Sequence, residues 1–236
     1  MQLLAGEIHV WMISLAEIFS LKELTNLLDE TEHQRSANFH YPTAQQRFLI
    51  RHGARRLILS KYLDVQSARL RYSYTEYGKP YVAGTTGISF SASASENLGV
   101  LCLSRNPVGI DIEHIKLQFS GDYLDEIIKM HASVDEKVQW TKVPYELKIR
   151  SFYTWWTRKE AYVKAMGTGL HMQLDTFTVE IDPRNNPRKS ELSLQIRWFP
   201  LSNSLLSGYV GNMVSIGEDA TVKYFRWDNK EVASCQ

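Results

Sequence analysis

Val108-Gly109-Ile110-Asp111-Ile112-Glu113 is a stretch in which apolar and acidic residues alternate. Successive side chains of a strand point to opposite faces, so Asp111 and Glu113 share one face and Ile110 and Ile112 share the other. Two carboxylates this close resist joint ionisation when they are buried. A hard divalent cation such as magnesium relieves that repulsion, because carboxylate oxygens are ligands it prefers. The same pattern also fits a half-exposed strand with both acids in water.

Around this strand, strands and helices mix without a regular βαβ alternation, which favours an α+β fold over a doubly wound sheet. Residues rich in strand formers predict strands at 7–15, 87–95, 98–104, 177–181, 192–198, 213–216 and 222–225. Helical spacing of apolar residues predicts helices at 21–28, 43–63, 123–130 and 145–166. The polar stretch 29–42 is expected to be a connection that ends at Pro42.

The chain has 236 residues, of which 44% are hydrophobic, enough for one large domain or two small ones. Pro107 interrupts it, and we expect a soft boundary there, with halves at residues 1–106 and 107–236. No run approaches the roughly 18 apolar residues of a membrane span, and the first residues lack a basic leader, so neither a membrane segment nor a signal peptide is expected. Cys102 and Cys235 make no disulfide framework or metal cluster, which favours the cytoplasm.

A second acidic position lies in the predicted helix at 145–166. Trp156, Glu160 and Lys164 follow one another at i, i+4 and share one stripe. Phe152 and Trp155 should anchor this helix in a core, which would hold the stripe at an interface, although an ordinary surface ion pair between Glu160 and Lys164 is the alternative. Three acids and a lysine can stabilise charge on a phosphoryl group. Transfer from a nucleotide-like donor and metal-dependent hydrolysis of a phosphodiester both remain open.

The first half carries a local excess of positive charge that the overall charge of +1 conceals. Between residues 47 and 79, eight basic residues face two acidic ones, so the segment can attract an anion. A solvated helix face followed by an edge strand is the alternative interpretation. The basic residues are Arg47, Arg51, Arg55, Arg56, Lys61, Arg69, Arg71 and Lys79.

These motifs resemble the Sfp-type 4′-phosphopantetheinyl transferases. The family signatures are a (V/I)G(I/V)D(I/V)E strand, here residues 108–113, and a W-x-x-K-E-(A/S)-x-x-K helix, here Trp156-Thr157-Arg158-Lys159-Glu160-Ala161-Tyr162-Val163-Lys164. Tyr77-Gly78-Lys79-Pro80 resembles the family's GKP turn, and Gly167-Thr168-Gly169-Leu170 resembles its G-x-G-L segment. Arg35 falls where a basic residue precedes the family's F-x-x-P/D stretch. The resemblance runs in consistent order from about residue 8 to 225.

The resemblance implies a cytoplasmic monomer of two similar α+β halves related by a pseudo-twofold axis, with the active site at their junction. The first half would bind the nucleotide end of coenzyme A, and the second would hold the metal and dock the carrier protein. The implied reaction moves 4′-phosphopantetheine from coenzyme A to a serine of an apo acyl or peptidyl carrier protein and releases 3′,5′-ADP. Fatty-acid, polyketide and peptide-synthetase carriers all remain open. No nucleic-acid partner is expected.

The resemblance also assigns roles to residues. Asp111, Glu113 and Glu160 would bind Mg²⁺, Glu160 would deprotonate the serine directly or through water, and Lys164 would ease departure of the ADP oxygen. Lys159 would assist in binding coenzyme A. The other expected coenzyme contacts are Arg35, Arg47, Gly78, Lys79, Pro80, Ser93 and Ser95, while Arg47 and Arg51 could equally face an acidic carrier protein.

One segment departs from the family. Its N-x-S-H-S stretch, whose histidine contacts coenzyme phosphate, is here Ser91-Ala92-Ser93-Ala94-Ser95, with Ala94 in place of the histidine. A methyl group cannot donate to phosphate, so weaker coenzyme binding, a shifted phosphate and compensation by a nearby arginine are all open. The departure also makes a non-catalytic module that binds coenzyme A or a carrier protein an alternative function, with a metal-dependent phosphodiesterase as a third.

Overall fold

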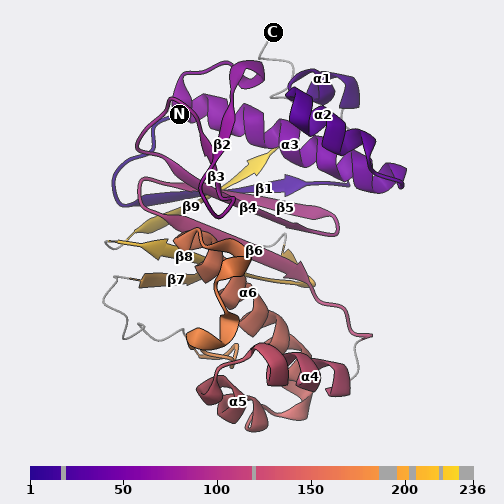
Figure 1. The fold of residues 1–236 in the computed structure, drawn as a ribbon, viewed down its shortest axis with the longest axis vertical. Helices are drawn as coiled ribbons and strands as arrows, with labels where there is room; N and C mark the ends of the chain where they lie inside the picture. Colours follow the sequence, from indigo (N-terminus) through magenta and orange to yellow (C-terminus); the bar gives the residue numbers. More distant parts are fainter. Residues whose placement is uncertain (17–19, 119–120, 186–195, 202–205, 218–219, 229–236) are drawn as a thin grey trace.

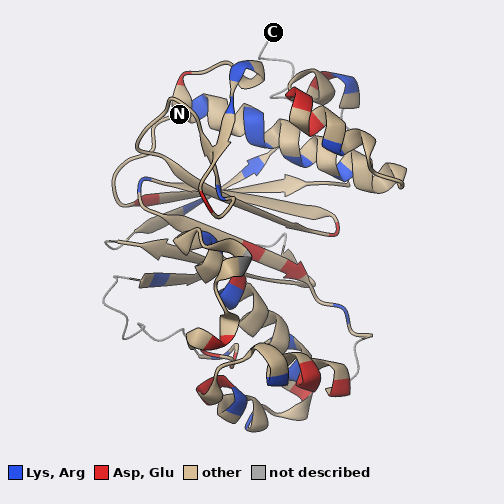
Figure 2. Cartoon of the chain, in the orientation of Figure 1, with Lys and Arg blue, Asp and Glu red and all other residues tan. Residues whose placement is uncertain are grey.

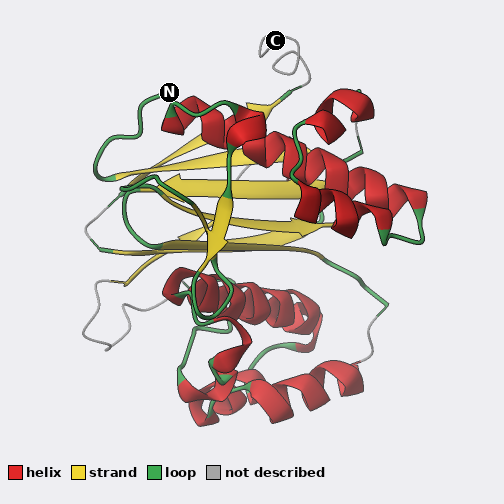
Figure 3. Cartoon of the chain, turned by 45° about the horizontal axis from the view of Figure 1, so that its top comes forward, coloured by secondary structure: helices red, strands yellow, loops and turns green. Residues whose placement is uncertain are grey.

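The computed structural model describes residues 1–16, 20–118, 121–185, 196–201, 206–217 and 220–228. Two β-sheets pack against each other in the middle of the molecule, and a long helix covers the outer side of each (Figures 1 and 3). The predicted mixture of helices and strands in an α+β arrangement is confirmed. Among the described residues, no helix is both long and apolar enough to cross a lipid bilayer.

The elements alternate irregularly along the chain. The helices are α1 (Leu21–Asn26), α2 (Glu30–Ala37), α3 (Pro42–Leu63), α4 (Gly121–His131), α5 (Val134–Thr141) and α6 (Lys148–Met166). The strands are β1 (Glu7–Ser14), β2 (Tyr72–Tyr74), β3 (Pro80–Val82), β4 (Ser89–Ser95), β5 (Leu98–Ser104), β6 (Val108–His114), β7 (Ile196–Pro200), β8 (Tyr209–Ile216) and β9 (Thr221–Trp227). Short 3₁₀ turns are η1 (Ser67–Arg69), η2 (Tyr145–Leu147), η3 (Gly169–His171) and η4 (Leu174–Thr176).

The two larger sheets divide the strands unevenly between the halves. The first has the order β4-β5-β1-β9, with β1 antiparallel to β5 and parallel to β9, and the second has the antiparallel order β6-β8-β7. Strand β9 belongs to the second half of the sequence, after the expected boundary at Pro107, but it pairs with β1 and completes the sheet of the first half. Strands β4 and β6 are edge strands of their sheets, and this puts β6 at the junction between them.

Helix α3 begins as its sequence suggests, with Pro42 in its first turn, where the missing N–H costs nothing. It ends at Leu63, and the residue that caps it, Asp64, adopts a left-handed conformation with φ 49°. Ile50, Leu57 and Ile58 are almost fully buried in the core between α3 and the first sheet. Each such side chain contributes about 1.5–3 kcal/mol through removal of apolar surface from water.

The alternation in β6 has the predicted consequence. Ile110 and Ile112 are fully buried in the core between the two sheets, where they meet residues of β1 and β5 such as Val10 and Val100. Asp111, on the other face, is only 4% exposed. The strand thus supplies the apolar contact between the sheets with one face and carries its acids on the other.

Two of the predicted secondary-structure assignments are wrong. The stretch 29–42 contains helix α2, which starts with a capping box in which Asp29 accepts from the backbone N–H of Glu32 and Glu32 accepts from that of Asp29. Residues 177–181 form no strand, because their N–H groups bond to side chains instead of a neighbouring strand. Val179 donates to Glu136 over 2.6 Å and Ile181 donates to Gln139 over 3.0 Å. Residues 192–195 of another predicted strand lie outside the described residues.

Gly109 allows β6 to touch α6 backbone to backbone. A Cβ atom built on Gly109 would lie 2.0 Å from the carbonyl oxygen of Ala161 and 2.3 Å from the nitrogen of Ala165. Both neighbours are main-chain atoms of a helix, so a change of side-chain rotamer cannot relieve the clash. The close approach brings Asp111 within reach of side chains from α6.

We expect Gly109→Ala to destabilise the protein by about 3 kcal/mol or more, because the added methyl group must separate β6 from α6. Gly99→Ala in β5 is the matched control, since its Cβ would meet nothing closer than 3.5 Å. That variant should stay within about 1 kcal/mol of the parent. Urea unfolding followed by circular dichroism measures both, and equal losses in the two variants would contradict the steric argument.

Candidate active site

Asp111 is held by donors from both halves of the chain. Lys164 Nζ, from α6, lies 2.6 Å from its Oδ1, and Ser93 Oγ, from β4, donates to the same oxygen over 2.7 Å. The other oxygen, Oδ2, is buried and has no hydrogen-bond partner. A buried carboxylate oxygen without a partner is costly, so this atom is suited to receive a further positive charge.

Glu113 and Glu160 belong to the same electrostatic group. Burial raises the pKa of both carboxyls, and the negative charge of Asp111 raises both further, while Lys164 opposes the shift. Glu113 also accepts a hydrogen bond from Ser95 Oγ over 2.7 Å. Lys164, with Lys116 close to Glu113, does not balance the three acids, so this corner is short of positive charge.

Asp111, Glu113 and Glu160 offer the oxygen ligands that a divalent cation prefers, but their side chains are not gathered into a finished site. Within the described ranges, no three His, Cys, Asp or Glu side chains are grouped as a finished metal site. The partnerless Oδ2 of Asp111 and the mutual repulsion of Asp111, Glu113 and Glu160 nevertheless match what a hard cation relieves. The donor set is oxygen only, which suits magnesium.

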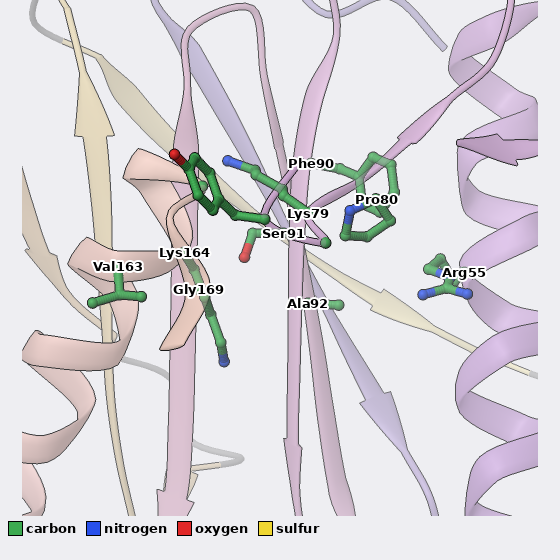
Figure 4. Close-up of a pocket in the computed structure, with 12 residues that line it drawn as sticks. Arg55, Lys79, Pro80, Phe90, Ser91, Ala92, Val163, Lys164 and Gly169 are labelled. Atoms are coloured by element: carbon green, nitrogen blue, oxygen red, sulfur yellow. The ribbon is translucent and has the colours of Figure 1, made fainter. Parts of the chain in front are cut away.

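A cavity of about 240 Å³ opens beside this corner. Figure 4 shows Arg55 reaching it from α3 on one side and Lys164 from α6 on the other, with β4 between them. Its lining consists of residues 77–80 and 90–92, together with Arg55, Val163, Lys164, Gly167 and Gly169. Residues of both halves thus enclose one cavity next to the acids.

The turn at residues 77–80 is tied to the second half. Gly78 adopts φ 81°, a left-handed conformation that glycine tolerates best. Lys79 Nζ donates to the carbonyl oxygens of Val108 over 3.1 Å and Ala165 over 3.2 Å. Gly167 leaves room for this lysine, since a Cβ there would lie 3.1 Å from Lys79 Cδ. The ammonium of Lys79 therefore holds the turn in place, and burial lowers its pKa.

Known proteins of one family are similar to this chain in sequence. The model of the 4′-phosphopantetheinyl transferase superfamily matches residues 107–214. The 4′-phosphopantetheinyl transferase HetI of Nostoc sp. is 31% identical over 186 residues, which cover 77% of each chain. This chain belongs to the 4′-phosphopantetheinyl transferase superfamily.

Two further relatives have the same kind of name. The transferase gsp of Aneurinibacillus migulanus is 30% identical over 52% of this chain and 51% of its own length, and Sfp of Bacillus subtilis is 26% identical over 66% of this chain and 67% of its own length. Like these relatives, the chain is an enzyme of the phosphopantetheinyl transferase type.

Two residues of this transferase that were expected to contact coenzyme A, Ser93 and Ser95, bond to carboxylates of the protein instead. Ser93 and Ser95 donate to Asp111 and Glu113 and are not among the residues that line the described cavity, whereas Ser91 of the same strand is. A hydroxyl has one proton to donate, so neither can donate to a phosphate while these bonds persist.

The expectation that Lys159 assists in binding coenzyme A is corrected. Lys159 is fully buried, and its ammonium lies 2.7 Å from Glu136, 2.6 Å from the carbonyl oxygen of Leu174 and next to that of Phe177. Lys159 directly precedes Glu160 on α6, and consecutive side chains leave a helix in different directions, so Lys159 points to another side. Its charge anchors α6 to α5 and to the segment after η3.

The basic residues of the first half are mostly paired within the protein. Arg56 is fully buried and bonds to Asp29 and Glu32, each over 2.6 Å. Figure 2 shows acidic positions of the short helices beside the basic positions of α3. Arg47 contacts Glu96 over 3.4 Å and Asn97 over 2.8 Å. The excess of positive charge counted between residues 47 and 79 is offset in part because Asp29, Glu32 and Glu96, which pair with these arginines, lie outside that segment.

Two basic residues of the first half, Arg55 and Lys79, line the cavity, and Arg55 reaches it from α3. Its guanidinium lies 4.5 Å from the ring of Tyr72 and donates to Glu32 over 2.9 Å. Arg35 is exposed on α2, and neither it nor Arg47 is among the residues lining the cavity. The i, i+4 spacing of Arg47, Arg51 and Arg55 was visible in the sequence, but which of them faces the cavity depends on how α3 sits on the sheet.

The mutation Lys159→Met tests the corrected role of this lysine. We expect a loss of about 3–5 kcal/mol in unfolding free energy, because Glu136 would be left as an unpaired buried charge. The double variant Lys159→Met, Glu136→Gln should recover part of that loss, and Lys142→Met at an exposed site should lose little. Coenzyme A affinity of the folded variant, measured by calorimetry, should be unchanged. A weaker affinity at unaltered stability would contradict the structural role.

The pair of Glu32 and His52 predicts a stability that falls on acidification. His52 Nδ1 donates to Glu32 over 2.7 Å, yet burial, with help from Arg55 and Arg51, lowers the pKa of His52 to about 4. The partners His52, Arg56 and Arg55 lower the pKa of Glu32 to about 2 against the opposing effect of its burial. Both groups bind protons more readily in the unfolded chain, so their contribution is present above the unfolded pKa values and is lost as the pH falls.

We therefore expect unfolding free energy to decrease by on the order of 3 kcal/mol between pH 6.5 and pH 4 through His52. Glu32 adds a further loss only below about pH 4.5. Urea titrations at four pH values measure the slope, which His52→Asn should flatten between pH 6.5 and 4. His40→Asn, at an exposed loop position, should keep the parent slope. An unchanged slope in the His52 variant would contradict the prediction.

Proposed function

We propose that this transferase moves 4′-phosphopantetheine from coenzyme A to a serine hydroxyl of an apo acyl or peptidyl carrier protein and releases 3′,5′-ADP, with Mg²⁺ as cofactor. One observation carries the proposal. Asp111, Glu113, Glu160 and Lys164 gather beside a cavity whose walls come from both halves. The names of the relatives, which are all 4′-phosphopantetheinyl transferases, support the group that is moved.

We propose further that the active site lies at the junction of two similar halves. Each half has a long helix, α3 or α6, packed on its own sheet, which supports the similarity (Figure 1). Bonds from Ser93 to Asp111 and from Lys79 to Val108 and Ala165 cross the junction. A monomer in the cytoplasm is our expectation for the working state.

The cavity suits the nucleotide end of coenzyme A. Gly78 and Pro80 form a narrow turn on one wall, and Lys164 and Arg55 add positive charge on opposite sides of β4. Coenzyme A carries about four negative charges, so cations at both sides favour its phosphates. Arg35 and Arg47 stay predicted coenzyme contacts, and Arg55, which lines the cavity, joins them as a proposed contact.

The carboxylates and the lysine have separate roles in the proposed chemistry. Asp111, Glu113 and Glu160 would hold magnesium, which when bound neutralises oxygens of the diphosphate. Glu160 has a raised pKa because of burial and neighbouring negative charge, which suits a base that takes the serine proton. The serine oxygen then bonds to phosphorus as the bond to the ADP oxygen breaks. Lys164, whose side chain is 30% exposed, would donate to that departing oxygen.

Incubation with MgCl₂, coenzyme A and an apo carrier protein should add about 340 Da to the carrier, as read by intact-mass spectrometry. Asp111→Ala and Glu160→Ala should each reduce the rate by a factor of about 100 or more, because each removes a charge that the reaction needs. Glu30→Ala, at an exposed position on α2, is the control and should keep the parent rate.

Circular dichroism should show that the two active-site variants remain folded. A panel of acyl and peptidyl carriers, assayed side by side, identifies the preferred acceptor. Tight coenzyme binding without a mass change on any carrier would replace the transferase with the binding module. Release of nucleotides from nucleic acid under magnesium would favour the phosphodiesterase.

A further inference from the structure

Three serines alternate along β4 and direct their hydroxyls at β6. Ser91, Ser93 and Ser95, here called the serine ladder, bond to groups of the facing edge strand. Ala92 and Ala94 point the other way and pack against the core under α3. The ladder therefore connects β4 and β6, which are edge strands of two separate sheets. Each serine bonds to a different residue of β6.

The rungs at Ser93 and Ser95 end on the acids. Ser93 donates to Asp111 Oδ1 and Ser95 donates to Glu113 Oε2, each over 2.7 Å. Ser95 also accepts from the backbone N–H of His114 over 3.0 Å. Ser91, in contrast, accepts from the backbone N–H of Ile110 over 3.2 Å. Only two of the three rungs therefore bond to a carboxylate.

The bonds to Asp111 leave one oxygen free. Ser93 and Lys164 both donate to Oδ1, so the carboxylate is fixed in rotation while Oδ2 stays buried without a partner. A ligand oxygen that is oriented by bonds to its neighbour loses less rotational freedom when a cation binds. Groups that orient ligands in this way commonly change metal affinity 10–100-fold.

We propose that Ser93 and Ser95 are positioning residues that orient Asp111 and Glu113 for a divalent cation, and that they do not bind coenzyme phosphate. This inference rests on the metal role of Asp111 and Glu113 in the proposed function. The serines come from the first half and the carboxylates from the second, so cation affinity depends on how the halves are joined. Their hydroxyl protons are already donated to carboxylates, so these hydroxyls cannot donate to a phosphate while the bonds persist.

Titration of the full chain with Mn²⁺ in the absence of coenzyme A, followed by calorimetry or by the electron paramagnetic resonance signal of free Mn²⁺, tests the inference. Ser93→Ala and Ser95→Ala should each weaken Mn²⁺ binding by a factor of about 10–100. Ser91→Ala removes a rung without touching a carboxylate and should leave Mn²⁺ affinity unchanged. Ser93→Thr keeps the hydroxyl and should restore most of the affinity, which also guards against a loss caused by misfolding.

Two outcomes overturn the inference, and they differ from failure of the proposed function. Parent-like Mn²⁺ affinity in Ser93→Ala and Ser95→Ala, with weaker coenzyme A binding measured without metal, would assign the hydroxyls to phosphate. If Ser91→Ala weakened Mn²⁺ binding as much as the other two variants, the serine ladder would be a purely structural connection. If the parent chain itself binds no Mn²⁺, the metal role in the proposed function fails first.

Discussion

The carboxylate of Asp111 is the group on which the arrangement of the site depends. It is almost fully buried at the junction, and a buried charge is tolerated only when donors surround it. One donor comes from β4 and one from α6, so the two halves and the helix must meet in register for the charge to be stable. Gly109 makes that register possible because it lets the α6 backbone approach β6 closely. The fold and the site are thus constrained by the same contact.

Other buried charges serve only the architecture, and the difference lies in how completely they are paired. Lys159 has a carboxylate and two carbonyl oxygens around its ammonium, and Arg56 has two carboxylates and two carbonyl oxygens. At the junction, Glu113 and Glu160 have raised pKa values from burial and from Asp111, and one oxygen of Asp111 lacks a partner. Between these two sets, the carboxylates at the junction are the incompletely paired ones and therefore the candidates for chemistry, whereas Lys159 and Arg56 hold helices in place.

The sequence predicted the main elements around the site because their patterns are local. The alternation in β6 and the i, i+4 stripe of Trp156, Glu160 and Lys164 depend only on geometry within one element. Lys159 was misassigned because its partner, Glu136, lies on a different helix, and no local pattern joins them. Helix α2 was missed although Asp29 and Glu32 formed a recognisable capping signal. The segment 177–181 has the composition of a strand, but tertiary bonds to Glu136 and Gln139 decided otherwise.

The face of β4 that Ala94 occupies sets the direction of its side chain. Alternation sends Ser93 and Ser95 to β6, so residue 94 points to the core under α3 together with Ala92. Ala92 and Arg55 both line the cavity, so β4 and one arginine of α3 bound the same space. A residue at 94 is therefore oriented toward α3 and away from the acids. Arg55 brings a guanidinium to the cavity from α3, the side toward which residues 92 and 94 point, so it is the arginine to which the compensation hypothesis applies.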